Sequence, residues 1–401
     1  MIKFGFNIKT MQDIEITNKK VLVRTDFDVS LNKKQQIAND TRLLKALPTI
    51  QELLQNKNKV ILVSKLGRPN GHDKTLSLAP VAKELQTKFP SFKVTLVDDF
   101  LSVKGQEILG NQLQKEIMLL ENIRFYQEEK ENNAVFSKKL ADLADVFVLD
   151  AFAMAHRKEA SVTGVTHFLP SYAGLELENE VNAIAKAIQN PKKPVVAIMG
   201  GAKIADKLAF VGKLIELADY LLVGGGIANT FLYAKGFEVG ESLCDKDEKQ
   251  HVLELFRLAE KHKTQIILPT DVVGLKKAQR ENDIYHVTEI PSDAQVYDIG
   301  PETQAQFGEI ITQAKTIIWN GPVGYFEMEP FNRGTDFLFY AIADNPHAYS
   351  LVGGGDTLAA IAHKDYLTKI SHISTGGGAM LEFIENGTLP GLEALKKSQQ
   401  K

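Results

Sequence analysis

The stretch YSLVGGGDTLAA, residues 349–360, joins a short apolar run to a helix-forming run through three successive glycines. Bare backbone at the start of a helix can approach an anion closely, because no side chain intervenes and the first N–H groups are free. The carboxylate of Asp356 would repel a phosphate unless a metal ion lay between them. The stretch therefore predicts a strand, a turn and a helix that bind a magnesium nucleotide. An ordinary glycine turn with a capped helix is the simpler alternative for this motif alone.

The strand and helix pattern of this stretch recurs along the whole chain. Short β-branched runs occur at residues 20–24, 59–63, 93–97, 117–120 and 146–149, and again at 195–199, 220–223, 265–268, 316–319 and 349–352. Helical apolar spacing lies between them, for example in residues 40–55 and 247–262. Repeated alternation of this kind predicts an α/β fold with parallel sheets covered by helices on both faces, which is a doubly wound, Rossmann-like architecture.

The length of 401 residues exceeds the size at which a single core keeps growing, so we expect two domains. Residues 176–192 read as one polar-faced helix that ends at Pro191 and Pro194, with no strand of its own. We therefore predict a first domain over residues 1–175, a hinge helix over 176–192, and a second domain over 193–387.

The composition excludes several classes of protein. A net charge of −3 without any basic block gives no electrostatic footprint for a nucleic-acid partner. The single cysteine, Cys244, allows no internal disulfide and no cysteine-based zinc site. No apolar run is long enough for a membrane span, and residues 1–13 lack the apolar core of a signal peptide. A soluble cytoplasmic protein is the expectation.

Glycines concentrate in the second half of the chain, where 21 of the 29 lie beyond residue 200. They follow predicted strands at positions 200–201, 224–226, 321–324, 353–355 and 376–378. Because ligands of open parallel sheets bind at the carboxyl ends of the strands, these loops predict a nucleotide crevice. The chain has no GxxxxGK[ST] motif, which disfavours a P-loop protein, and GGGIAN does not complete GxGxxG, which disfavours a nicotinamide oxidoreductase. Lys203 and Lys207, four residues apart, are expected on one face of a helix start, where they could neutralise phosphate charge.

The first half carries arginines at the same positions after strands. They are Arg24, Arg68, Arg124 and Arg157, with Arg42 at the start of the first helix. Guanidinium groups bind phosphate and carboxylate oxygens in pairs, so this group predicts a socket for a small polyanion. Surface salt bridges are the alternative for each arginine taken singly. A nucleotide site and a polyanion site on two hinged domains are what phosphoryl transfer requires.

The whole chain resembles the phosphoglycerate kinase family. The matching segments, in order along the chain, are RTDFDV (24–29), DTRLLKALPTI (40–50), SKLGRP (64–69), LLENIRFYQEE (119–129), DAFAMAHRKEAS (150–161), MGGAKIADKL (199–208), VGGGIANTFL (223–232), WNGPVGYFE (319–327), GGGDT (353–357) and STGGGA (374–379). The resemblance implies transfer of a phosphoryl group between 1,3-bisphosphoglycerate and MgADP, which gives 3-phosphoglycerate and ATP. It also implies a cytoplasmic, monomeric enzyme that closes about its hinge, and a C-terminal segment, residues 388–401, that returns to the first domain.

The resemblance also implies roles for individual residues. Phosphoglycerate would be bound by Asp26, Phe27, Asp28, Arg42, Lys65, Leu66, Gly67, Arg68, Arg124 and Arg157. The nucleotide would be bound by Gly201, Lys203, Lys207, Gly225, Asn320, Glu327, Gly353, Gly354, Gly355, Asp356 and Thr357, with Glu327 on the ribose and Asp356 near Mg²⁺. Arg42, Lys203 and Lys207 would stabilise the phosphoryl group in transit.

The departures from the family pattern all lie in the first domain. Asp28, Ser30 and Lys65 stand where the family usually has asparagine, proline and histidine; Leu149 replaces an asparagine, and Ala153 and Met154 replace a glycine and a small hydroxyl residue. An extra carboxylate beside an anionic substrate costs about 1 kcal/mol or more, and Lys65 brings a charge that could offset it. We therefore predict that Asp28 and Lys65 form a compensating pair. An inactive or substrate-shifted relative that binds nucleotide is the alternative to an active kinase.

Overall fold

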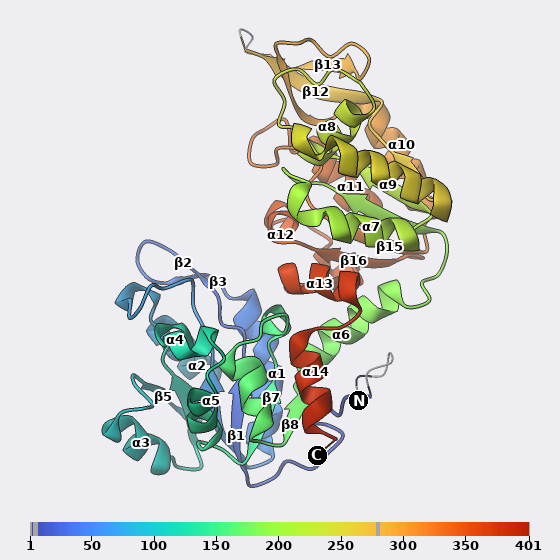
Figure 1. Ribbon diagram of the computed structural model, residues 1–401. Coiled ribbons are helices and arrows are strands. Elements are labelled where there is room, and N and C mark those ends of the chain that lie inside the picture. Colours follow the sequence, from blue (N-terminus) through green and yellow to red (C-terminus); the bar gives the residue numbers. More distant parts are fainter. Residues whose placement is uncertain (1, 3–6, 278–280, 401) are drawn as a thin grey trace. The chain divides into compact units, whose positions relative to one another are not determined.

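The computed structural model describes residue 2, residues 7–277 and residues 281–400. The chain forms two compact units, one of Met1–Asn182 with Asn386–Lys401 and one of Ala183–Glu385. The boundary falls inside helix α6 (Leu175–Ile188), which confirms the predicted helix in this region, while its role as a hinge stays a prediction. Figure 1 shows the elements of each unit in the order of the chain.

The first unit is built on a six-stranded parallel sheet in the order β5-β6-β4-β1-β7-β8. Its strands are β1 (Lys20–Arg24), β4 (Lys59–Val63), β5 (Lys93–Val97), β6 (Glu116–Leu120), β7 (Val146–Leu149) and β8 (Ser171–Ala173). Five of them were predicted from their apolar runs. Strand β8 was missed, because three residues carry too little pattern to read.

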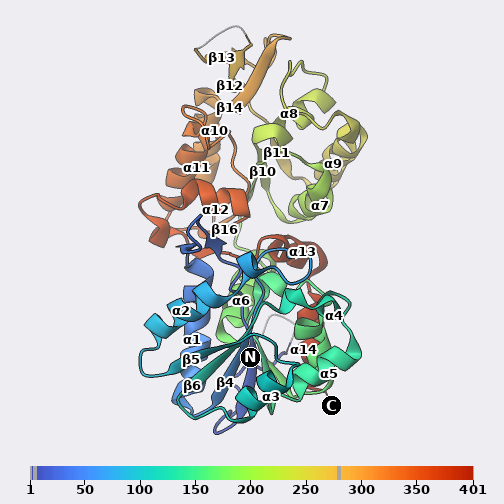
Figure 2. The ribbon, with the colours of Figure 1, turned by 90° about the vertical axis from the view of Figure 1, so that its left-hand side faces the viewer.

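Helices cover both faces of this sheet (Figure 2). They are α1 (Thr41–Gln55), α2 (Ala79–Lys88), α3 (Val103–Gly110), α4 (Gln127–Lys130), α5 (Ala134–Ala141) and α14 (Pro390–Ser398). In α1 the buried residues Leu43, Ile50 and Leu53 recur at helical spacing and pack with the sheet residues Val21 and Val60. That packing holds the start of α1, and with it Arg42, beside the end of β1.

The C-terminal helix α14 belongs to the first unit. Its Gly391 N–H donates to the Ala155 carbonyl at 2.7 Å, and the Ser398 hydroxyl donates to the Leu169 carbonyl at 3.1 Å. Leu149, at the end of β7, is fully buried and lies against Gly391. The buried, apolar side chain of Leu149 therefore forms part of the surface on which α14 packs.

The second unit contains another six-stranded parallel sheet, in the order β11-β10-β9-β15-β16-β17. Its strands are β9 (Val195–Met199), β10 (Tyr220–Val223), β11 (Gln265–Ile267), β15 (Thr316–Asn320), β16 (Tyr349–Gly353) and β17 (His372–Ile373). The helices are α7 (Leu208–Leu217), α8 (Gly225–Ala234), α9 (Lys249–His262), α10 (Pro301–Gln313), α11 (Arg333–Ala343), α12 (Gly355–Ile361) and α13 (Gly378–Asn386). The α/β class with parallel, doubly wound sheets is thus confirmed in both units.

Two antiparallel elements were not predicted. The second unit carries a three-stranded sheet of β12 (Asp271–Lys276), β13 (Asp283–His286) and β14 (Ala294–Ile299), in the order β13-β12-β14. The first unit carries a small hairpin of β2 (Ser30–Leu31) and β3 (Ile37–Asn39). Most residues of these strands are partly exposed, so they lack the continuous apolar runs that mark the strands of the parallel sheets.

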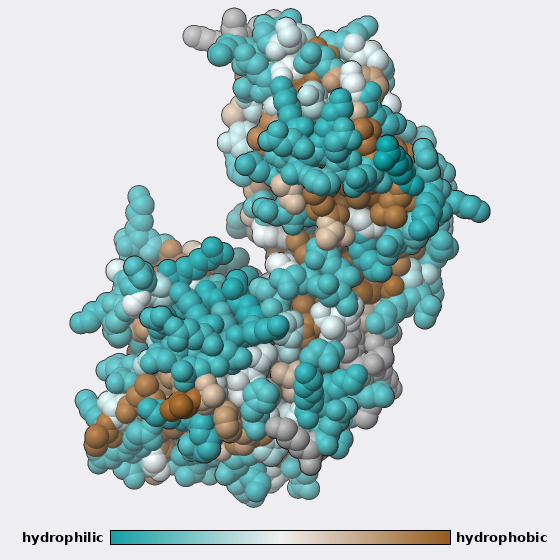
Figure 3. All heavy atoms as spheres, viewed as in Figure 1, coloured by the Kyte–Doolittle hydropathy of each residue, from teal (hydrophilic) through white to brown (hydrophobic). Residues whose placement is uncertain are grey.

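The surface seen in Figure 3 is mostly hydrophilic, with apolar side chains gathered in small, separate areas. Among the residues that the structure describes, no helix is long and apolar enough to cross a membrane.

Candidate active site

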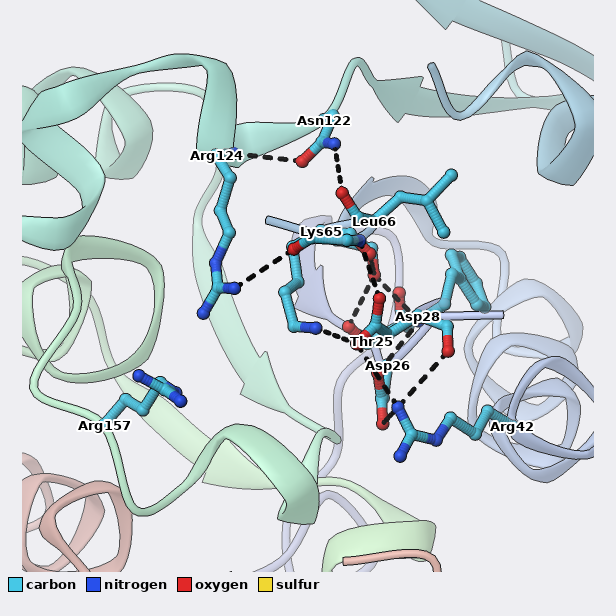
Figure 4. Close-up of polar contacts among 12 residues, drawn as sticks. Thr25, Asp26, Asp28, Arg42, Lys65, Leu66, Asn122, Arg124 and Arg157 are labelled. Atoms are coloured by element: carbon cyan, nitrogen blue, oxygen red, sulfur yellow. Dashed lines mark hydrogen bonds and ion pairs between the residues drawn. The ribbon is translucent and has the colours of Figure 1, made fainter. Parts of the chain in front are cut away.

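Basic and acidic side chains gather at the carboxyl ends of four neighbouring strands in the first unit. Arg124 follows β6, Lys65 follows β4, Asp26 and Asp28 follow β1, and Arg157 follows β7. Because β6, β4, β1 and β7 are adjacent in the parallel sheet, the loops after them share one edge. Figure 4 shows these side chains together with Arg42 from the first turn of α1. We refer to Arg42, Lys65, Arg124 and Arg157 as the basic cluster.

Asp28 holds two members of the basic cluster. Its Oδ2 accepts from the Lys65 ammonium and lies 3.5 Å from Arg42 Nη1, and its Oδ1 accepts from the Gly67 N–H at 2.8 Å. Arg42 Nη1 also lies 3.5 Å from Asp26 Oδ2. Burial alone would raise the pKa of Asp28, but Lys65, the Gly67 N–H and Arg42 outweigh it and hold the pKa below its ordinary value. The predicted contact between Asp28 and Lys65 is confirmed; its effect on activity stays a prediction.

Arg124 and Arg157 share a carboxylate that sequence reasoning missed. Glu159 Oε1 lies 3.1 Å from Arg124 Nη2 and 4.0 Å from Arg157 Nε. Arg124 Nη1 also donates to the Gly67 carbonyl at 3.2 Å, so this guanidinium is fixed from two sides. The only sequence signal for Glu159 is its place two residues after Arg157, within the segment HRKEAS.

Arg24 was grouped with the socket arginines, and the structure corrects this. Its side chain is fully buried, with Nε donating to the Ser161 hydroxyl at 2.8 Å and Nη1 to the Thr25 carbonyl at 2.6 Å. The same hydroxyl donates to Glu129, whose pKa is raised to about 7 because burial outweighs the attraction of Arg24. Arg24 is therefore held inside the protein by Ser161 and Thr25 and is not exposed to a ligand. Arg68 is exposed, and no ion pair of its side chain occurs among the described residues.

In the second unit, the glycine loops lie at the carboxyl ends of β9, β10, β15 and β16, as predicted, and of β17, a two-residue strand that was missed. The loops after β9, β10 and β15 approach one another through their backbones. A Cβ on Gly200 would lie 2.1 Å from the Pro322 carbonyl oxygen, and one on Gly321 would lie 2.1 Å from the Gly200 carbonyl oxygen. Gly354, which precedes α12, has φ of 101°, a conformation that side chains disfavour. Glycine is therefore required by the backbone at these positions.

A cavity of about 550 Å³ opens beside these loops. Four predicted nucleotide-site residues line it: Gly201, Gly225, Glu327 and Asp356. Its size is within the range of small-molecule sites, which is about 300 to 1,000 Å³. One wall was not predicted and comes from the antiparallel sheet and neighbouring segments, through Leu243, Val296, Tyr297 and Tyr325. These residues bring apolar and aromatic surface to a site that sequence reasoning described only by its polar groups.

Two side chains predicted to bind the nucleotide, those of Thr357 and Asn320, form hydrogen bonds within the protein. Thr357 is fully buried, and its hydroxyl oxygen accepts from the Gly321 N–H at 2.7 Å. Asn320 is also buried and donates through Nδ2 to the Gly353 carbonyl at 3.1 Å. These bonds therefore tie the end of β15 and the residue after it to the end of β16 and the first turn of α12.

The placement of Lys203 and Lys207 on one helix start was wrong. Helix α7 begins only at Leu208, after a 3₁₀ turn at Ala205–Lys207, and Lys203 precedes that turn. The turn is held by Asp245, which accepts from the Ile204 N–H at 2.8 Å. Lys207 Nζ donates to the Gly200 carbonyl at 3.4 Å; burial lowers the pKa of Lys207, and Asp356 partly opposes this. Lys203 is exposed.

An α/β protein with a nucleotide-sized cavity on one unit and a basic cluster on the other has the features of a small-molecule phosphotransferase. Comparison with known proteins agrees. The sequence pattern of the family described as phosphoglycerate kinase matches residues 11–387. The chain belongs to the phosphoglycerate kinase family.

Individual relatives match over nearly the full chain. The phosphoglycerate kinase of Moorella thermoacetica is 43% identical over 389 residues, which cover 96% of this chain and 98% of that protein. That of Dictyoglomus turgidum is 42% identical over 391 residues, covering 97% and 98%. The structure of phosphoglycerate kinase from Coxiella burnetii is 39% identical, with a TM-score of 0.88 over 97% of this chain and 99% of that one. The expected kinase activity class is confirmed, and no comparison favours an inactive relative or a nicotinamide oxidoreductase.

Proposed function

We propose that the protein transfers the acyl phosphate of 1,3-bisphosphoglycerate to ADP, which gives 3-phosphoglycerate and ATP in glycolysis. In this step the bond between phosphorus and the carboxyl oxygen breaks, and a bond forms between phosphorus and the terminal oxygen of ADP. Membership of the family over residues 11–387 is the observation that carries the proposal.

The basic cluster would bind the phosphoglycerate. Arg124 and Arg157 would take phosphate oxygens, and Arg42 would take the carboxyl end, beside Asp26. Lys65, Arg68 and the loop residues Phe27, Leu66 and Gly67 would complete the socket, with Asp28 holding Lys65 and Arg42 in place. Contacts that fix these side chains in advance support this assignment, because an ordered socket loses less entropy when it binds.

The cavity beside the glycine loops would bind the nucleotide. Glu327 would contact the ribose, and the N–H groups of the loop 353–355 would approach the phosphates. Lys203 and Lys207, together with Arg42, would offset the charge of the phosphoryl group in transit. Asn320 and Thr357 would act as positioning residues, since their side chains hold the end of β15 and Gly321 to the end of β16 and the start of α12.

The residues present fit a magnesium ion that arrives with the nucleotide. Asp356 is an exposed carboxylate on the cavity wall. The part of the chain that the structure describes has no group of three or more His, Cys, Asp or Glu side chains placed to hold a metal alone. Mg²⁺ commonly uses one or two protein carboxylates and takes its other ligands from phosphates and water, where it neutralises phosphate charge.

A coupled assay with ATP, Mg²⁺ and 3-phosphoglycerate tests the proposal, with the formation of 1,3-bisphosphoglycerate followed through NADH oxidation. Turnover that saturates in both substrates is expected. An Arg124→Ala variant, which removes one arm of the socket, should lose most of it. Absence of turnover by the unaltered protein, at substrate concentrations well above those of cells, would rule the activity out.

We further propose that the enzyme acts as a cytoplasmic monomer and that α6 serves as the hinge on which the two ligands are brought in line. The absence of a membrane-spanning helix among the described residues is compatible with this location. Light scattering at micromolar concentration would test the monomer, and X-ray solution scattering with and without both substrates would test the closure.

A further inference from the structure

Glu159 places a negative charge inside the basic cluster. Its side chain is only 6% exposed, and the residue lies two positions after Arg157 in the same loop. One oxygen, Oε1, faces both Arg124 at 3.1 Å and Arg157 at 4.0 Å. Glu159 therefore touches the two arginines to which the proposed function gives the phosphate of the substrate.

The burial of this contact makes its charge effective. The Arg124 side chain is 5% exposed, so water screens its attraction to Glu159 little. Within the described structure, Glu159 Oε2 and Arg124 Nε are buried without hydrogen-bond partners. The pair is thus incompletely satisfied: of the five side-chain N–H groups of Arg124, those with described partners are one on Nη1, which donates to the Gly67 carbonyl, and one on Nη2, which donates to Glu159.

A phosphate that binds Arg124 and Arg157 would meet the Glu159 carboxylate as a competitor. Both are anions, and both need the same guanidinium groups. Like charges at such separations repel even at the effective dielectric of a protein site. Asp28 faces Lys65 and Arg42, and Glu129 attracts the buried Arg24, to whose environment Glu159 also contributes. Glu159 is the carboxylate placed against both Arg124 and Arg157.

We propose that Glu159 is a positioning residue and an internal counter-anion. It orients Arg124 when the site is empty, and it lowers the affinity of the basic cluster for a phosphate monoester, so that product release is eased. This inference rests on the proposed function for the identity of the substrate, but its charge argument applies to any phosphate bound by Arg124 and Arg157.

Glu159→Gln tests the proposal, because glutamine has almost the same volume and keeps an acceptor oxygen for Arg124. The KM for 3-phosphoglycerate should fall about tenfold, equivalent to about 1.4 kcal/mol, while kcat changes less than about threefold. The dissociation constant for inorganic phosphate, measured by calorimetry without turnover, should fall to a similar extent. A KM and a phosphate affinity that stay unchanged or weaken would overturn the proposal, since a purely structural role predicts weaker binding.

Glu116→Gln provides the matched control. It removes another buried carboxylate of the same unit, which pairs with Lys93 at 2.9 Å. Glu116 lies at the amino end of β6, whereas Arg124 follows the carboxyl end of that strand. Neither KM nor phosphate affinity should change. If Glu159→Gln does not fold, Glu159→Asp withdraws the carboxylate by one methylene and should lower KM two- to threefold; a KM equal to or above that of the unaltered protein would then overturn the proposal.

The two proposals fail separately. Tighter phosphate binding by Glu159→Gln with no turnover by the unaltered protein would reject the proposed function and keep this inference. Turnover by the unaltered protein with no tightening in Glu159→Gln would keep the function and reject the inference.

Discussion

Asp28→Asn should destabilise the first unit, because it leaves the Lys65 ammonium buried without its carboxylate. The Lys65 side chain is 8% exposed and that of Asp28 25%. Two unit charges about 3 Å apart attract by about 5 to 6 kcal/mol at an effective dielectric near 20. Desolvation of the ammonium offsets most of this, so we expect a net coupling of about 1 to 3 kcal/mol. Because the pKa of Asp28 is depressed in the folded state, this stability is present above the ordinary carboxyl pKa and is lost as the pH falls through the depressed value.

A double-mutant cycle measures the coupling. Asp28→Asn, Lys65→His and the double variant are compared with the unaltered protein in urea unfolding followed by circular dichroism, and in kcat/KM for 3-phosphoglycerate. The losses of unfolding free energy in the two single variants should add up to more than the loss in the double variant, and the difference is the coupling energy. The pair of Lys93 and Glu116 serves as a control, since the Lys93 side chain is 70% exposed even though Glu116 is buried, and the coupling should stay below about 1 kcal/mol. Strictly additive losses in both measurements would refute the reasoning.

Three further predictions concern single side chains. The Asp150 carboxyl accepts from the Glu176 N–H at 2.8 Å at the start of α6, and burial raises its pKa to about 8. Its folded-state pKa lies above the unfolded value, so stability falls as the pH rises between the two, by about 1.4 kcal/mol per unit; Asp150→Asn should lack this slope, and parallel pH profiles would contradict it. Asp356→Asn should reduce kcat by roughly 10- to 100-fold and weaken the dependence on Mg²⁺, as tested by magnesium titration of the coupled assay. Thr357→Val leaves the buried Gly321 N–H without an acceptor and should cost about 1 to 3 kcal/mol of unfolding free energy, whereas an unchanged urea midpoint would show that water replaces the hydroxyl.

The parallel sheets could be predicted from the sequence because each of their central strands is a nearly continuous apolar run. Strand β4, KVILV, is buried from its second residue onward, so its pattern reports its position directly. Strand β14 could not be read in the same way, because its burial is mixed and its partner β12 shifts register after Val273. The wall that β14 gives to the cavity beside the glycine loops was therefore not predicted either.

Only part of the candidate site could be predicted from the sequence, for the same physical reason. Residues directly after strands could be placed at one edge, because parallel strands fix where their carboxyl ends lie. The contact of Glu159 with Arg124 could not, since it joins residues 35 positions apart through side-chain conformations that no periodicity encodes. The prediction that Lys203 and Lys207 lie on one face of a helix was wrong for a related reason. A hydrogen bond from the Ile204 N–H to Asp245, 41 residues away, holds the segment around Lys203 and Lys207 in a turn, where the local spacing predicted a helix.

The two units differ in how much change the loops at the carboxyl ends of their strands can accept, which fits the expectation that the departures from the family pattern lie in the first unit. In the second unit the loops meet backbone to backbone, and a Cβ at Gly200 or Gly321 would lie 2.1 Å from a carbonyl oxygen. No rotation of a side chain relieves such a contact, so substitution there has no local remedy. In the first unit the contacts run between long side chains, and the charge that Asp28 introduces meets the Lys65 ammonium directly. A socket built from side chains can therefore exchange one ion pair for another and keep its shape, whereas a loop built from backbone cannot.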